Sequence, residues 1–136
     1  MTQSIESAAV LGAGVMGSAI AAHLAGCGVR TLMLDMPTST QEGTRNQVAE
    51  SGLAKALKIK PATFYTPKAA NLIEVGNFED DLERLKGCDV VIEAVVERLD
   101  IKQSLFEKIA PHIAENAILA SNTSGLSLAE LASVLP

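Results

Sequence analysis

Residues 8–28 read AAVLGAGVMGSAIAAHLAGCG, and this stretch decides the fold. Its first four residues form a short apolar run, typical of a strand that is buried on both faces. Glycines interrupt the run from Gly12 to Gly17. The Ala-rich segment Ser18–Ala25 then predicts a helix, which the sequence Gly26-Cys27-Gly28 ends. A strand, a glycine turn and a helix in this order predict the first unit of a parallel sheet.

The rest of the chain continues this alternation. Further strands are predicted at residues 31–34, 72–75, 89–93 and 117–120. Helices are predicted at residues 42–57, 80–86, 100–110 and 126–135, and residues 61–71 look irregular. In the helix at 100–110, Asp100 is the expected N-cap, and Ile101, Leu105 and Ile109 form the expected apolar face. We therefore expect an α/β fold, Rossmann-like and doubly wound, with a mostly parallel sheet and helices on both faces.

The glycine turn has the pattern G-x-G-x-x-G between a strand and a helix, where the pattern predicts dinucleotide binding. Gly12 permits the tight turn, Gly14 lets a pyrophosphate approach the backbone, and Gly17 lets the helix lie close to the strand. The free N–H groups and the dipole of the helix then face the phosphates. The alternative is a turn that binds nothing. The candidate cofactor-binding residues here are Gly12, Ala13, Gly14, Val15, Met16 and Gly17.

Asp35 ends the second predicted strand, 23 positions after Gly12. An acidic residue at about this distance hydrogen-bonds the ribose hydroxyls of NAD. Its charge would repel the 2′-phosphate of NADP, and the following Met36 and Pro37 offer no arginine to hold one. The expected cofactor is therefore NAD. The alternative role for Asp35 is a helix N-cap.

Length and composition restrict the classes further. The 136 residues carry a net charge of −5, and 48% are hydrophobic. This predicts one globular domain spanning residues 1–136 and argues against nucleic-acid binding. Cys27 and Cys88 are expected to be buried thiols, and with His23 and His112 they show no metal-ligand spacing. No secretory leader and no apolar run of about 20 residues are evident, so the expected compartment is the cytoplasm.

Two more polar clusters follow predicted strands. Glu93 and Glu97 lie four positions apart, which suggests acid/base catalysis without requiring it, and Glu97 with Lys102 is equally consistent with a solvated ion pair. The sequence Ser121-Asn122-Thr123-Ser124-Gly125 follows the last strand. There it would lie over a nicotinamide, would cap the helix at 126–135, or would do both.

Three stretches resemble the N-terminal domain of the L-3-hydroxyacyl-CoA dehydrogenases. They are the glycine motif, which many dehydrogenases share, and two more specific segments, VVIEAVVERLDIKQSLF (90–106) and ILASNTSGLSL (118–128). SGLAKALKIKPATFYTP (51–67) and GNFEDDLERL (76–85) are similar to the long bacterial members that also carry an enoyl-CoA hydratase region. The resemblance covers nearly the whole chain.

The resemblance implies roles for individual residues. Those matching Glu97 and Lys102 contact the NAD ribose and nicotinamide region, which replaces the solvated ion pair as the expected role. The residue matching Ser124 interacts with substrate and nicotinamide, and Asn122 has a supporting role. Candidates for binding the phosphates of CoA are Lys55, Lys58 and Lys60.

The implied reaction is the NAD-dependent oxidation of an L-3-hydroxyacyl-CoA to the 3-oxoacyl-CoA in fatty-acid β-oxidation. The family's catalytic histidine and its C-terminal helical domain, which makes the usual dimer contact, match nothing up to Pro136. We therefore expect residues 1–136 to bind NAD without turnover, as part of a homo-oligomeric parent enzyme that acts on acyl-CoA. The alternatives are a domain of a β-hydroxyacid dehydrogenase that does not use CoA, and a non-enzymatic NAD-binding module.

Overall fold

A computed structural model describes residues 5–37, 46–58 and 71–121 of the chain, and their core is a five-stranded parallel sheet. The strands lie in the order β3-β2-β1-β4-β5. In chain order the elements are β1 (Ser7–Leu11), α1 (Val15–Gly26), β2 (Arg30–Asp35), α2 (Gln47–Lys58), β3 (Ile73–Asn77), η2 (Leu82–Gly87), β4 (Val90–Glu93), α3 (Leu99–Ile109), η3 (Ala110–His112) and β5 (Ile118–Ser121).

The central strand β1 pairs with β2 on one side and with β4 on the other. The register aligns Leu11 with Leu34 of β2 and with Glu93 of β4. The chain builds the sheet outward from β1 through β2 to β3, and then returns to add β4 and β5 on the opposite side. In a doubly wound sheet, this reversal between β1 and β4 marks where ligands bind, at the carboxyl ends of the strands.

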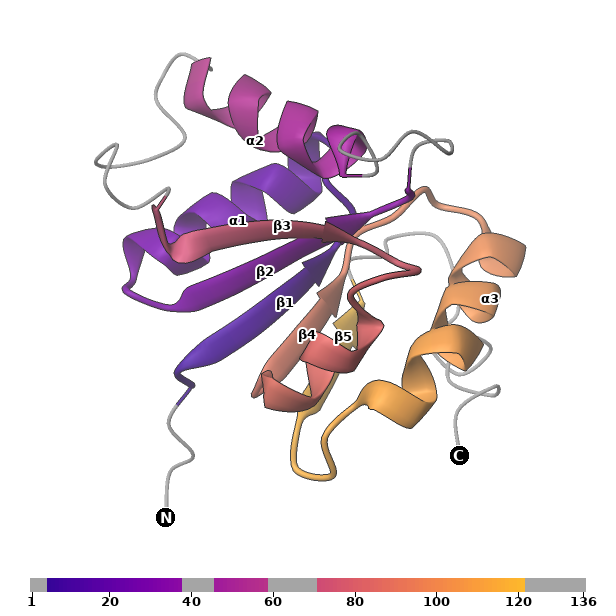
Figure 1. The fold of residues 1–136 in the computed structure, drawn as a ribbon. Coiled ribbons are helices and arrows are strands. Elements are labelled where there is room, and N and C mark those ends of the chain that lie inside the picture. The colour runs from indigo at the N-terminus through magenta and orange to yellow at the C-terminus, as the bar shows by residue number, and fades with distance from the viewer. Residues whose placement is uncertain (1–4, 38–45, 59–70, 122–136) are drawn as a thin grey trace.

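Helices cover both faces of the sheet, as the sequence predicted (Figure 1). Helices α1 and α2 lie on one face, and η2 and α3 lie on the other. Each face has its own cluster of buried residues. Successive residues of a strand point to opposite faces, so Val10 packs in the cluster under α1 and α2, whereas Leu11 packs in the cluster under η2 and α3. Both clusters are mainly aliphatic, and the one under η2 and α3 also contains Phe78 and Phe106.

Helix α1 packs closely because its buried residues are small. They are Gly17, Ser18, Ala21, Ala22 and Ala25. A Cβ on Gly17 would lie 1.8 Å from the carbonyl oxygen of Gly12. A Cβ on Gly52 of α2 would lie 2.2 Å from the carbonyl oxygen of Ala13. Both helices therefore touch the backbone of the glycine turn directly.

Several element boundaries differ from the prediction. Helix α1 begins at Val15, not Ser18, because the N-cap is Gly14. The N-cap of α3 is Arg98, whose backbone is extended, so Asp100 lies in the first turn of the helix and does not cap it. The helix expected at 80–86 is a 3₁₀ helix that begins at Leu82. In the part of the chain that is described, the helix expected at 42–57 begins at Gln47, and the helix expected at 126–135 lies outside that part.

The prediction for the cysteines is half right. Cys88 is buried, but Cys27 is exposed because it caps the carboxyl end of α1, and Gly28 follows it with a φ of +83°.

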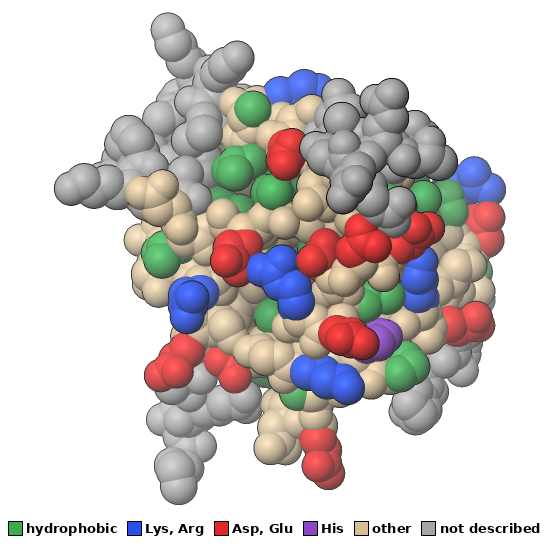
Figure 2. Space-filling model, in the orientation of Figure 1, with side chains coloured by type: hydrophobic (Ala, Val, Ile, Leu, Met, Phe, Trp, Pro, Cys, Tyr) green, Lys and Arg blue, Asp and Glu red, His purple; other side chains and the backbone are tan. Residues whose placement is uncertain are grey.

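On the face seen in Figure 2, acidic and basic side chains are interspersed. None of the described helices is both long enough and apolar enough to cross a bilayer.

Candidate functional site

A cleft of about 650 Å³ opens at the carboxyl ends of the strands, beside the reversal between β1 and β4. Its walls come from the glycine turn, the ends of β2, β3 and β4, and one side of α3. Lining residues are Gly12, Gly14, Asp35, Met36, Pro37, Phe78, Glu79, Ala94, Val95, Val96, Asp100, Ile101, Ser104, Leu105 and Lys108.

In the glycine turn, tight packing requires a glycine at position 12, whereas the space beside Gly14 is open. Gly12 has a φ of +117°, and a Cβ there would lie 2.6 Å from the carbonyl oxygen of Ala94. Gly14 is exposed, lines the cleft, and would place a Cβ with no atom within 4 Å. The first N–H groups of α1 have no acceptor within the helix. This open approach to a helix N-terminus fits a diphosphate, which a side chain on Gly14 would obstruct.

Asp35 lies at the end of β2 with its carboxylate fixed against the glycine turn. One oxygen, Oδ2, accepts a hydrogen bond of 2.7 Å from the Ala13 N–H, and Oδ1 accepts one of 2.7 Å from the Met36 N–H. Each carboxylate oxygen can accept more than one hydrogen bond, so both keep capacity for a ligand hydroxyl. These partners are the glycine turn and the next residue in the chain rather than the first turn of a helix.

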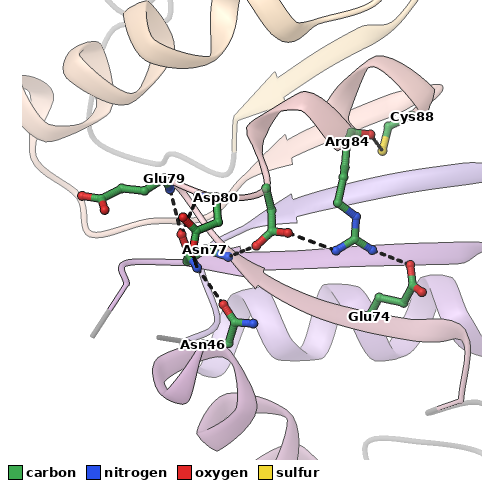
Figure 3. A network of polar contacts seen from close by, with 8 residues as sticks. Asn46, Glu74, Asn77, Glu79, Asp80, Arg84 and Cys88 are labelled. Atoms are coloured by element: carbon green, nitrogen blue, oxygen red, sulfur yellow. Dashed lines mark hydrogen bonds and ion pairs between the residues drawn. The ribbon is translucent and has the colours of Figure 1, made fainter. Parts of the chain in front are cut away.

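The turn after β3 carries Phe78 and Glu79 into the cleft wall, and Asn77 holds it (Figure 3). The Asn77 side chain is almost fully buried. Its Oδ1 accepts hydrogen bonds from the N–H groups of Glu79 at 2.9 Å and Asp80 at 2.8 Å. Its Nδ2 donates to Asn46 Oδ1 at 2.8 Å, which ties the turn to the start of α2.

The same network continues into η2 (Figure 3). The Asn77 N–H donates to Asp81 Oδ2 at 2.8 Å, and Asp81 Oδ1 lies 3.3 Å from Arg84 Nη1. The other nitrogen, Arg84 Nη2, lies 2.6 Å from Glu74 Oε2 on β3. Exposed ion pairs of this kind contribute little stability. The buried Asn77 therefore fixes this wall of the cleft, and no local sequence pattern indicated it.

A buried charged cluster lies at the carboxyl end of β4. The side chains of Glu93 and Lys102 are both fully buried, and Lys102 Nζ lies 3.0 Å from each carboxylate oxygen of Glu93. The same Nζ lies 3.1 Å from Glu97 Oε1, whose side chain is 40% exposed. Glu93 also accepts hydrogen bonds from the Val95 N–H, at 2.7 Å, and from the Ser121 hydroxyl. The Glu97–Lys102 ion pair therefore exists, but only its carboxylate is partly exposed to solvent, because the ammonium group is buried against Glu93.

Helix α3 is rotated slightly relative to the prediction: Leu105 and Ile109 are buried as expected, but Ile101 is not. Its buried residues are Lys102, Leu105, Phe106 and Ile109, whereas Ile101 is 37% exposed and lines the cleft. The four buried residues have the helical spacing i, i+3, i+4, i+7. Hydrophobic periodicity predicts this face only if a lysine is accepted as a core residue. The rotation turns Ile101 and Ser104 towards the cleft, which the sequence analysis missed.

The structure brings most of the predicted cofactor residues to one edge of the sheet. Gly12, Gly14 and Asp35 line the cleft, and Glu97 follows β4 at the same edge. Lys55 is exposed on α2. The side chain of Lys58 is not described, and Lys60, Asn122 and Ser124 lie outside the described residues. Within the described residues, His, Cys, Asp and Glu side chains form no group that could hold a metal ion.

Comparison with known families gives a match over residues 7–136 to the model of the 3-hydroxyacyl-CoA dehydrogenase NAD binding domain. A probable 3-hydroxyacyl-CoA dehydrogenase of Deinococcus radiodurans is 48% identical over 124 residues, covering 91% of this chain and 36% of that protein. Another from Bacillus subtilis is 41% identical over 145 residues, covering 97% of this chain and 18% of that protein. The chain thus spans about a third or less of the length of these relatives.

Solved structures agree on the fold. The (S)-3-hydroxybutyryl-CoA dehydrogenase of Ralstonia eutropha matches with a TM-score of 0.74 and 31% identity, over 97% of this chain and 46% of that one. FadB2 of M. tuberculosis matches with a TM-score of 0.76 and 28% identity, over 98% of this chain and 46% of that one.

Proposed function

Because the chain belongs to the family of 3-hydroxyacyl-CoA dehydrogenase NAD-binding domains, we propose that it holds NAD for the oxidation of an L-3-hydroxyacyl-CoA to the 3-oxoacyl-CoA. The substrate and the reaction belong to the longer protein that such a domain serves. The relatives include putative trifunctional enzymes of fatty acid oxidation from Rickettsia, which supports a role in that process.

The open space beside Gly14 is the observation that most strongly supports NAD binding. A glycine with no atom within 4 Å of its Cβ position, at the N-terminus of a helix and facing a cleft of about 650 Å³, leaves room for a diphosphate. The N–H groups of the first turn of α1 would bind the phosphate oxygens. Asp35, fixed by its hydrogen bond from Ala13, would accept hydrogen bonds from the ribose hydroxyls.

The nicotinamide end of the site would lie at the ends of β4 and β5. Bound NAD supplies a nicotinamide ring that accepts a hydride from the substrate carbon. We assign Glu97 and Lys102 to the ribose and nicotinamide region, Ser124 to the substrate oxygen, and Asn122 to a supporting role. For the phosphates of CoA, the candidates remain Lys55, Lys58 and Lys60. The family resemblance supports these assignments.

We also propose a cytoplasmic location and a homo-oligomeric parent enzyme. The exposed thiol of Cys27 supports a reducing compartment, because exposed free thiols are poorly suited to an oxidising one. The family resemblance supports the oligomer.

Two measurements test the proposed function. Titration of the 136-residue chain with NADH, followed by nucleotide fluorescence, should saturate, and NADPH should bind more weakly. The longer protein that contains this domain should oxidise NADH with acetoacetyl-CoA, seen as loss of absorbance at 340 nm, but not with free acetoacetate. Equal rates with both would favour a β-hydroxyacid dehydrogenase that does not use CoA. NADH binding without reduction of either substrate by the longer protein would favour a non-enzymatic module.

A further inference from the structure

Glu93 is the buried carboxylate for which the proposed function has no use. It ends β4, its side chain is fully buried, and it is absent from the described residues that line the cleft. A carboxylate with no access to the cleft cannot exchange a proton with a ligand there. Any effect of Glu93 on the bound cofactor must therefore pass through the groups that it touches.

Those groups come from three parts of the chain. Lys102 of α3 places its ammonium nitrogen 3.0 Å from both carboxylate oxygens. Val95 donates its N–H at 2.7 Å, which fixes the carboxylate relative to the turn that follows β4. Ser121 donates its hydroxyl from the end of β5, directly before the segment that contains Asn122 and Ser124. One carboxylate thus joins the ends of two strands to the first turns of α3.

The charges in this cluster are unusual for a core that has only a packing role. Removing a carboxylate and an ammonium group from water is costly, and a well-packed apolar pair is often at least as stable. The fully buried Lys102 lies between Glu93 and the partly exposed Glu97. Glu93 therefore gives the buried Lys102 ammonium group a second carboxylate partner besides Glu97, at the carboxyl edge of the sheet.

We propose that Glu93 is a positioning residue for the cofactor site: it holds the buried Lys102 ammonium group, and through it the partly exposed Glu97 carboxylate, together with the Ser121 hydroxyl, in place at the nicotinamide end of bound NAD. This inference rests on the proposed function, in which Lys102 and Glu97 serve that end of the cofactor. Glu93 is then required for cofactor affinity although it does not touch the cofactor.

The test uses three variants of the 136-residue chain: Glu93→Gln, Lys102→Met and the double variant. Glu93→Gln retains the shape, and its single amide oxygen can still accept the Val95 hydrogen bond, while its amide nitrogen would donate to the Ser121 oxygen; the substitution removes the charge that holds Lys102. We expect each single variant to weaken NADH binding about tenfold, the size of one hydrogen bond to a charged group. Each single variant should also lower the melting temperature. Exposed Glu107, on α3, provides the control variant Glu107→Gln, which should change neither quantity.

The double variant separates positioning from packing. It removes both buried charges, so its melting temperature should return towards that of the unmodified chain. Its NADH dissociation constant should nevertheless stay equal to that of Lys102→Met, because Glu93 acts through Lys102. Recovery of both stability and affinity in the double variant would show that the pair is only structural. An unchanged affinity in Glu93→Gln would also overturn the proposal.

Three further outcomes have separate meanings. If Glu93→Gln does not fold, Ser121→Ala decides, because it leaves all charges in place; a two- to threefold weaker affinity at an unchanged melting temperature would support positioning, and an unchanged affinity would overturn it. If the unmodified chain itself fails to bind NADH, the proposed function has failed, and the positioning role fails with it. Normal binding by the unmodified chain, with unaffected variants, refutes the positioning role alone.

Discussion

Two glycines of one turn should respond oppositely to substitution. Gly14 lines the cleft and would present a side chain to open space, whereas a Cβ on Gly17 would lie 1.8 Å from the carbonyl oxygen of Gly12. Gly14→Val should therefore remove cofactor binding and leave the fold intact. Gly17→Ala should damage the fold, because either α1 or the turn must move by more than an ångström to accept the methyl group.

The magnitudes separate clearly. Gly14 is the N-cap of α1 and makes no side-chain hydrogen bond, so an apolar replacement costs about 0.5–1 kcal/mol of stability. Loss of about two phosphate contacts, each worth about 1.5 kcal/mol, would correspond to a roughly 150-fold loss of affinity. Gly17→Ala overpacks a closed contact and should cost about 3 kcal/mol, a fall of roughly 10 °C in melting temperature for a domain of this size.

Circular dichroism melts and NADH fluorescence titrations on the same samples measure both effects. We expect Gly14→Val to keep the spectrum and to lose binding, and Gly17→Ala to melt early. If Gly14→Val binds NADH as tightly as the unmodified chain, the turn is a structural feature and the diphosphate does not lie there. A fully stable Gly17→Ala would contradict the closed packing of α1 on the turn.

Further predictions concern other parts of the molecule. The unmodified chain should prefer NADH to NADPH, and Asp35→Ala should narrow the difference in dissociation constant about tenfold, mainly by weakening NADH; equal affinities in the unmodified chain would exclude this role for Asp35. Gly52→Ala should lower the melting temperature by several degrees, since its Cβ would lie 2.2 Å from the Ala13 carbonyl oxygen; an unchanged melt would show that α2 can shift without cost. Burial and, to a smaller extent, the charge of Asp89 raise the pKa of the Cys88 thiol above its ordinary value of 9.0. The free energy of unfolding should therefore fall as pH rises beyond 9.0, because the unfolded chain loses this proton before the folded chain does. A urea titration at pH 8, 9 and 10 measures this, with Cys88→Ala as the control that removes the dependence. With acetoacetyl-CoA and NADH, residues 1–136 alone should give no absorbance loss at 340 nm, and turnover that Ser124→Ala removes would contradict our placement of the catalytic base outside them.

Local patterns were enough to predict the sheet, the glycine turn and the position of Asp35. Each is encoded within a few neighbouring residues: the apolar run up to Leu11, the glycines after it, and an acid at the end of the next strand. The strand order then places the carboxyl ends of these strands together. The sequence could therefore predict a ligand site at this edge of the sheet, with the glycine turn beside it.

The buried charges could not be predicted in the same way. The spacing of Lys102 suggested a solvated ion pair with Glu97, because a lysine is rarely buried unless it is paired. Its partner Glu93 is nine positions away and on a different element. Asn77 likewise depends on Asn46, 31 positions earlier, to satisfy its amide. Contacts of this kind arise from the tertiary arrangement and leave no periodic signal in the sequence.

The two faces of the sheet have consequences for synthesis of the chain on the ribosome. The cluster under α1 and α2 draws its buried members from residues 10–73, so it can close once the first half of the domain has emerged. The opposite cluster needs Phe106 and Ile109, and the β1–β4 pairing joins residues about 80 positions apart, which is slow to form. Until then Leu11 and Leu34 present an uncovered apolar surface, so we expect aggregation of the nascent domain to begin on that side.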